Sequence, residues 1–445
     1  MSVNLKQCEL LAPAGGFSQL KAAIRFGANA VYLAGNKFGM RARANNFSLQ
    51  EIGEAVKLAH SAGVSVHVTA NTIMHEADLR ELPAFFEALE SFGVDAVIVG
   101  DLGALALAVK YAPHVARHAS TQASITNALA AKTWYDLGAS RVVLAREMSL
   151  ESIAALAKGV PVGLELEAFV HGAMCMAYSG RCMLSAAMCG RSANKGFCAQ
   201  PCRWSYALVE QNRPNLAFPI EEDEFGTYVM NAYDLCMIEH LQELANAGVT
   251  SFKLEGRNKR AFYVASVVHA YRAVMDGETP ESVMPDLYAI SHRPYGTGFY
   301  FGQPKQRLDK DGYDKECIHV ATVTKCDANA EVADANVNGV DARNNSSTGS
   351  TNGYTVTVTC HNRFAENQTL ELLEPHAPIK QIVIRNIMWH PAQEGERCVA
   401  PVPVEVANRA METYTFEHCE PIEAGSFLRA QASETVGAAQ NNAAK

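Results

Sequence analysis

The stretch QEIGEAVKLAHSAGVSVHVTA (residues 50–70) decides the fold of the first part of the chain, because it holds one complete repeat of a pattern. Gln50–Ser61 spaces its apolar residues as an amphipathic helix does. Gly63 ends this helix, since only glycine enters the left-handed conformation without a steric cost. Val64–Ala70 follows as a short apolar strand. Helix, glycine and strand form the repeating unit of a parallel α/β fold.

The same unit recurs on both sides of this stretch. The further helices and their strands are Phe17–Arg25 with Ala30–Ala34, Pro83–Ser91 with Ala96–Gly100, Ala128–Tyr135 with Arg141–Ala145, and Leu235–Asn246 with Ser251–Leu254. Three more strands are expected near Leu10, at His118–Ala123 and at Leu164–Val170. About eight strands in this arrangement favour a closed TIM-like (β/α) barrel over residues 1–300. An open, doubly wound sheet is the alternative, but no GxGxxG follows the first strand.

The helix Ala261–Met275 is expected to pack on the outside of the barrel, and a second domain is expected to follow it. From about Cys317 the pattern alternates as half-buried strands do. The expected strands are His319–Thr324, Tyr354–Cys360, Thr369–Leu373 and Gln381–Ile384. Residues 315–432 are therefore predicted to form a small all-β, β-barrel-like domain. Residues 328–353, rich in Asn, Ser, Gly and Asp, are expected to be a flexible insertion, and residues 433–445 a disordered tail.

Composition narrows the class of protein. Of the 445 residues 48% are hydrophobic and 19% charged, which is typical of a soluble globular protein. The polar start MSVNLKQ and the lack of a long apolar run argue against secretion and membrane insertion, so we expect a cytoplasmic protein. The net charge of −9 means that nucleic-acid binding would need a local basic patch.

The cysteines are unevenly spread along the chain. Of twelve, five lie within 28 residues: Cys175, Cys182, Cys189, Cys198 and Cys202. In a reducing compartment disulfides explain such a group poorly, so the loop at residues 171–206 is predicted to bind metal. The wide first spacing of C-x6-C-x15-C-x3-C suits an iron–sulfur cluster better than structural zinc. Ligation by Cys182, Cys189, Cys198 and Cys202, or ordinary buried thiols, are the alternatives.

The same loop is basic. It carries Arg181, Arg191, Lys195 and Arg203, and no Asp or Glu occurs from His171 through Val209. These cations could bind an anionic partner or cofactor. They could equally balance the charge of a reduced cluster or be solvated surface residues.

Polar residues also gather where the predicted strands end. They are Asn71, Asp101, Ser120, Gln122, Arg146, Glu147, Glu167, His171, Lys253, Glu255 and Arg257. Lys253, Glu255 and Arg257 alternate and so share a face, where they could bind a carboxylated small molecule or form a salt-bridge network that closes the barrel. His171 precedes Cys175 and is a further candidate catalytic residue, although a thiolate that ligates a cluster is not free to attack. No GxSxG or HExxH is present.

A family resemblance rests on several segments. ELLAPAGG, AVYLAG, DLCMIEHL, SFKLEGR and the block HGAMCMAYSGRC…RSANKGFCAQPCRW resemble the peptidase U32 family, also called collagenase-like proteases. The resemblance covers roughly residues 8–275 and continues weakly at HNRFAENQTLELLEP. Despite the family name, its studied bacterial branches resemble iron–sulfur hydroxylation factors. One branch takes part in prephenate-dependent formation of 5-hydroxyuridine at the tRNA wobble position. Sister branches hydroxylate a ribosomal RNA cytidine or support oxygen-independent ubiquinone hydroxylation.

HGAMCMAYSGRC followed by GTYVMNAYDLCMIE is most similar to the tRNA branch. The resemblance implies an iron–sulfur cluster of the 4Fe–4S type, prephenate as a possible co-substrate, and tRNA as the partner. Cys175, Cys182 and Cys198 match three of the family's ligands, and either Cys202 or Cys236 matches the fourth. Cys189 lies outside the family pattern. A peptidase and a zinc-stabilised binding module are the competing functions.

Overall fold

The computed structural model describes residues 3–40, 46–175, 179–204, 207–209, 217–219, 232–305, 313–329, 353–391 and 400–432. The chain divides into two compact units. The first comprises Met1–Leu287 with Ser291–Asp314, and the second comprises Tyr288–Ile290 with Lys315–Lys445. Among the described residues, no helix combines the length and the apolar character needed to cross a membrane.

The first unit is a closed parallel barrel, as predicted. Its strands are β1 (Glu9–Pro13), β2 (Ala30–Ala34), β3 (Ser65–Ala70), β4 (Ala96–Val99), β5 (Ala116–Ala119), β6 (Arg141–Val143), β7 (Glu165–Gly172) and β11 (Ser251–Leu254). Each pairs in parallel with the next, and β11 lies between β1 and β7, which closes the ring. This closure excludes the open-sheet alternative.

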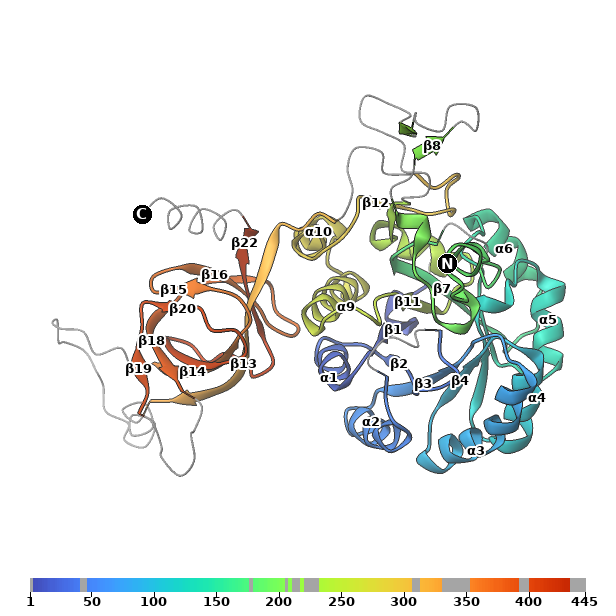
Figure 1. Ribbon diagram of the computed structural model, residues 1–445, viewed down its shortest axis with the longest axis horizontal. Helices are drawn as coiled ribbons and strands as arrows, with labels where there is room; N and C mark the ends of the chain where they lie inside the picture. The colour runs from blue at the N-terminus through green and yellow to red at the C-terminus, as the bar shows by residue number, and fades with distance from the viewer. Residues whose placement is uncertain are drawn as a thin grey trace. The chain divides into compact units, whose positions relative to one another are not determined.

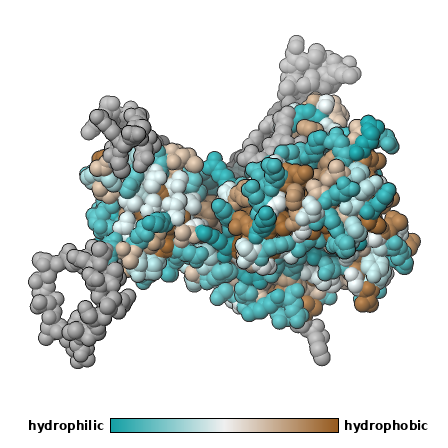
Figure 2. Space-filling view, turned by 90° about the horizontal axis from the view of Figure 1, so that it is seen from below, coloured by the Kyte–Doolittle hydropathy of each residue, from teal (hydrophilic) through white to brown (hydrophobic). Residues whose placement is uncertain are grey.

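Helices surround the strands (Figure 1). They are α1 (Phe17–Arg25), α2 (Leu49–Ser61), α3 (Glu76–Phe92), α4 (Leu102–Tyr111), α5 (Ala128–Asp136), α6 (Leu150–Gly159), α8 (Leu241–Asn246), α9 (Ala261–Asp276) and α10 (Pro280–Ala289). Helix α2 shows why the repeat folds locally: Ser48 and Glu51 form a capping box at its start, and Gly63 follows its end with φ +71°. On the face shown in Figure 2, hydrophilic side chains predominate and apolar ones form smaller patches.

Three predicted elements are wrong in part. The helix expected at Pro83–Ser91 begins earlier, at Glu76, where the Asp78 carboxylate accepts from the His75 N–H at 2.8 Å. The helix expected at Leu235–Asn246 begins as strand β10 (Asp234–Cys236), antiparallel to β7, and only α8 is α-helical. Long-range contacts override the local pattern here: Asp234 accepts a hydrogen bond from the Arg293 backbone N–H at 3.0 Å and pairs with its guanidinium at 3.1 Å. The strand expected at His118–Ala123 stops at Ala119, because the Ser120 side chain caps a short 3₁₀ helix, η2 (Thr121–Ala123).

The second unit is an antiparallel sheet that curls on itself (Figure 1). Its order is β17-β16-β22-β13-β14-β21-β18-β19. The strands are β13 (Cys317–Ala328), β14 (Tyr354–Cys360), β16 (Thr369–Leu373), β17 (Lys380–Val383), β18 (Arg385–His390), β19 (Val402–Pro403), β21 (Thr413–His418) and β22 (Phe427–Gln431). Alternate residues of β14, such as Val356 and Val358, are buried in its core. Nearly all of the expected insertion and all of the expected tail lie outside the described residues.

Candidate functional site

A pocket opens at the carboxyl ends of the barrel strands, where (β/α) barrels carry their active sites. Its empty volume, open mouth included, is about 540 Å³. It is lined by Tyr32, Met40, Thr69, Asn71, Ile98, Ser120, Thr121, Gln122, Val143, Arg146, Phe169, Lys253, Glu255 and Arg257. Most of the polar strand-end residues singled out from the sequence thus meet in one place. Asp101 does not, because its carboxylate caps α4 by accepting from the Ala104 N–H at 3.1 Å.

Three cations, Arg146, Lys253 and Arg257, and one carboxylate, that of Glu255, are the charged residues of the pocket lining. Arg257 is 4% exposed and donates to the Thr69 hydroxyl at 3.3 Å. Glu255 accepts from the Tyr32 hydroxyl at 3.3 Å and lies 3.9 Å from Arg146. Lys253 both lines the pocket and pairs with a buried carboxylate. The two roles considered for Lys253, Glu255 and Arg257, a ligand pocket and a salt-bridge network, are therefore compatible.

The cysteine loop is fastened to the mouth of this pocket. Two glycines allow the close approach: a Cβ at Gly172 would lie 2.6 Å from the Glu255 carbonyl oxygen, and one at Gly180 would lie 2.3 Å from that of Gln122. Both glycines have positive φ, +107° and +72°. Arg146, which lines the pocket, donates to the Ala173 carbonyl at 2.6 Å. Loop and pocket thus form one site.

Hydrogen bonds also fix the start of the loop over the strand ends. Ser179 donates through its backbone N–H to Glu147 at 2.6 Å, and the Ser124 hydroxyl donates to the Ser179 carbonyl. Farther along, the Ile73 N–H donates to the Asn194 carbonyl at 3.1 Å. The loop therefore rests on segments that follow three different barrel strands.

The five cysteines are spread over this loop as reduced thiols rather than disulfides. Cys175 and Cys198 are exposed, whereas Cys182, Cys189 and Cys202 are half-buried. The loop contains a short helix, α7 (Leu184–Cys189), and two 3₁₀ turns, η3 (Ala193–Lys195) and η4 (Pro201–Arg203). The Gln200 N–H donates to the Cys198 sulfur at 3.3 Å.

The thiols of the loop are soft donors of the kind that both zinc and iron–sulfur clusters use. In the described part of the chain, no three cysteine sulfurs come close enough to ligate one metal ion. The ligands of a cluster bind different irons and stand farther apart, so the chemistry of this donor set is compatible with a cluster.

Cys236 approaches from another element. It lies on β10, where its Cα pairs with that of His171 on β7. Burial raises the pKa of its thiol to about 11, and the Tyr271 hydroxyl donates to its sulfur at 3.8 Å. Cys236 was expected on a helix, but the strand places it directly beside the start of the cysteine loop. Cys202 and Cys236 both remain candidates for the fourth ligand.

The basic residues of the loop have unequal surroundings. Arg181 is exposed. Arg191 donates to the carbonyls of Phe197 and Cys198 at 3.0 and 3.4 Å, so it also holds the loop together. Lys195 pairs with Asp78 of α3 at 3.2 Å. The side chain of Arg203 lies outside the described residues.

His171 does not line the pocket. It is 1% exposed, and the rings of Tyr263, Tyr271 and Tyr295 surround it at centroid distances of 6.1, 5.5 and 5.4 Å. Burial, with His292 and Lys259 nearby, lowers its pKa to about 3. It is therefore a neutral imidazole packed behind the cysteine loop.

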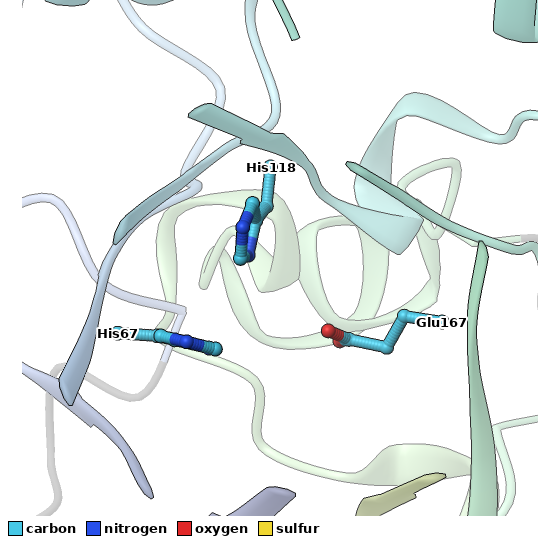
Figure 3. Close-up of side chains that lie close together, drawn as sticks. All are labelled: His67, His118 and Glu167. Atoms are coloured by element: carbon cyan, nitrogen blue, oxygen red, sulfur yellow. The ribbon is translucent and has the colours of Figure 1, made fainter. Parts of the chain in front are cut away.

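A buried group inside the barrel was not predicted from the sequence, although one of its members, Glu167, was among the strand-end residues. His67 on β3, His118 on β5 and Glu167 on β7 point toward one another, as Figure 3 shows. Their nearest ligand atoms lie within 4.8 Å, a spacing that could suit a metal ion. However, one Glu167 oxygen pairs with Lys253 at 2.5 Å and the other with Arg141 at 3.1 Å. Two cations already bound to this carboxylate oppose a dication there. Polar residues inside otherwise apolar strands were the signal available.

Comparison with known proteins shows the family to which this chain belongs. The model of peptidase family U32 matches residues 15–310. The chain belongs to this family. A U32 relative from Bacillus subtilis, "tRNA hydroxylation protein P1", is 39% identical over 68% of this chain and 73% of its own length. The Escherichia coli "tRNA hydroxylation protein P" is 31% identical over 83% of this chain and 87% of its own length.

A third U32 relative carries a different name. The Escherichia coli "23S rRNA 5-hydroxycytidine C2501 synthase" is 39% identical to this chain over 62% of it and 40% of the relative. The matches to the two tRNA-named proteins thus extend over a larger share of those proteins than the match to this one.

Proposed function

We propose that this U32 protein is a cytoplasmic, iron–sulfur-dependent enzyme that hydroxylates RNA, and specifically the wobble uridine of tRNA at position 5. The observation that carries the proposal is the joining of a cysteine-rich loop to the mouth of a pocket that contains Arg146, Lys253 and Arg257, through Gly172 and Gly180. The names of its relatives support RNA hydroxylation as the reaction class.

Cys175, Cys182 and Cys198, with Cys202 or Cys236, would hold the cluster. A bound cluster would supply one-electron chemistry. The protein contributes the placement of these thiols over the strand ends and the backbone N–H of Gln200 aimed at the Cys198 sulfur.

The pocket would bind a small carboxylated co-substrate, and we propose prephenate. Arg257, Arg146 and Lys253 face the same space, where buried guanidinium groups can form paired hydrogen bonds with carboxylates. Glu255 sits beside Arg146 and orients it. His171, buried and neutral behind the loop, would serve as packing around the cluster rather than as a base.

The RNA would approach from the loop side. Arg181, Arg191 and Lys195 lie on a segment without acidic residues, although Asp78 from α3 partly balances Lys195. Reversing the charge of the exposed Arg181 (Arg181→Glu) should weaken RNA binding, and the loss should shrink as salt rises. Glu281 on α10 offers a control position, where Glu281→Gln should leave RNA binding unchanged.

The test combines genetics with metal analysis. Mass spectrometry of tRNA nucleosides from a deletion strain should show loss of 5-hydroxyuridine, restored by the wild-type gene but not by Cys182→Ala. Anaerobically purified protein should contain iron and acid-labile sulfide. Unchanged 5-hydroxyuridine in a strain without paralogues rejects the tRNA assignment. Loss of a ribosomal RNA hydroxycytidine instead favours the alternative substrate, and stoichiometric zinc without iron rejects the cluster.

A further inference from the structure

We infer that Glu167 is a positioning residue, which fixes the Lys253 ammonium at the floor of the pocket for the anionic group of the small ligand. This inference rests on the proposed carboxylate site. It adds to that site a residue that lies beneath the pocket and does not line it.

Glu167 stands in a row of alternating charges through the barrel interior. Lys253 on β11 pairs with Glu167 on β7 at 2.5 Å, and Glu167 pairs with Arg141 on β6 at 3.1 Å. Arg141 in turn pairs with Glu9 on β1 at 2.5 Å. The Lys253 and Glu167 side chains are 5% and 0% exposed, so water cannot screen the interaction between them.

The upper end of this row reaches the pocket. Lys253 is a lining residue, and its ammonium lies 4.7 Å from the centroid of the Tyr32 ring and 5.5 Å from that of Phe169. Both rings also line the pocket. The Glu167 carboxylate below it and the ring faces beside it hold the ammonium in place. The pocket floor therefore presents a fixed positive charge.

The neighbouring histidines leave this charge pattern unchanged. Burial lowers the pKa of His67 and lowers that of His118 well below 6.5, so both rings are neutral. Burial also tends to raise the pKa of Glu167, but Lys253 and Arg141 lower it below its usual value. Glu167 is thus an anion that these two cations balance, and Figure 3 shows its carboxylate pointing toward the two imidazole rings.

Removing the charge of Glu167 should therefore act through Lys253. Glu167→Gln keeps the shape of the side chain but removes the anion, which frees the Lys253 ammonium to move. Glu165→Gln is the matched control: Glu165 lies on the same strand and pairs with the same Arg141 at 2.7 Å, but its side chain is 51% exposed.

The test is a double-mutant cycle on prephenate binding by calorimetry, with wild type, Glu167→Gln, Lys253→Met and the double variant. Glu167→Gln should weaken binding about tenfold or more, and Glu165→Gln by less than about twofold. In the Lys253→Met background, Glu167→Gln should cause no further loss. An equal loss in both backgrounds, or no loss at all, overturns the inference. If Glu167→Gln does not fold, Glu167→Asp keeps the charge but withdraws it from the ammonium, and the same cycle applies.

A second readout does not depend on the ligand. Reductive methylation with formaldehyde, followed by peptide mass spectrometry, should label Lys253 faster in Glu167→Gln than in wild type, with Lys259 as internal reference. Unchanged labelling of Lys253 overturns the inference. If wild-type protein fails to bind prephenate, the proposed co-substrate is wrong, and the labelling result alone then decides the role of Glu167.

Discussion

Gly180→Ala should detach the cysteine loop from the pocket. Residue 180 has φ +72°, and its added Cβ would lie 2.3 Å from the Gln122 carbonyl oxygen, closer than the 3.0 Å that real Cβ contacts respect. The loop must therefore withdraw by about 0.7 Å or more, since a packed backbone cannot be compressed. Gly190→Ala is the control, because Gly190 has φ +63° but nothing within 4 Å of its Cβ position.

The difference in the effects of Gly180→Ala and Gly190→Ala isolates the free energy that holds the cysteine loop on the pocket. Both carry the left-handed backbone cost of about 1–2 kcal/mol. Withdrawal at residue 180 also strains the hydrogen bonds between Ser179 and Glu147, at 2.6 and 3.2 Å, and the one from Ser124. Hydrogen bonds to a charged group contribute about 1.5–3 kcal/mol, so the undocked loop should become about 10 to 100 times more populated.

Limited proteolysis measures this population. At low trypsin concentration, cleavage at Arg181, Arg191 or Lys195 follows the fraction of open loop. Gly180→Ala should be cleaved about tenfold faster or more than Gly190→Ala and should retain less iron. Equal cleavage rates and equal iron contents in the two variants would refute the link between loop docking and cluster retention.

Three further predictions follow from the site. Of the two candidate fourth ligands, we expect Cys202→Ala to lose iron, because Cys202 shares the loop with Cys198; full iron there with loss in Cys236→Ala reverses the assignment. Arg257→Lys should lower 5-hydroxyuridine content at unchanged melting temperature, since one ammonium cannot form the paired contacts of a guanidinium; parallel losses of both make the role structural. His118 is neutral when folded but binds a proton below about pH 6.5 when unfolded, so the free energy of unfolding should fall from about pH 7 to about pH 5. Urea titrations should show a shallower fall for His118→Phe, and an identical slope contradicts this reasoning.

The barrel could be predicted from the sequence because the signals for its helices and strands each lie within a short stretch of the chain. Each helix, glycine and strand forms within a short window, as in Gln50–Ser61 with Gly63, and glycine with φ +71° ends that helix as expected. The same locality explains the error at residue 235. Apolar spacing there suggested a helix, whereas the partner of Asp234 is Arg293, far along the chain.

The candidate site was predictable in its residue types but not in its pairings. Lys253, Glu255 and Arg257 were identified from their alternation, and all three line the pocket. The row of charges through Glu167 and Arg141 was not identified, because four different strands contribute to it. Only closure of the ring brings such residues together.

That closure also sets an order of assembly during synthesis. Strand β11 is the last barrel strand to be synthesised, yet it lies between β1 and β7. Until Leu254 has left the ribosome, the other seven barrel strands can form only a sheet with two unpaired edges, and such edges can pair with other chains. The cysteine loop leaves the ribosome before β11, whereas Lys253 leaves with β11 and Glu255 and Arg257 leave just after it. Chains truncated before β11 should therefore aggregate rather than remain as soluble half-barrels.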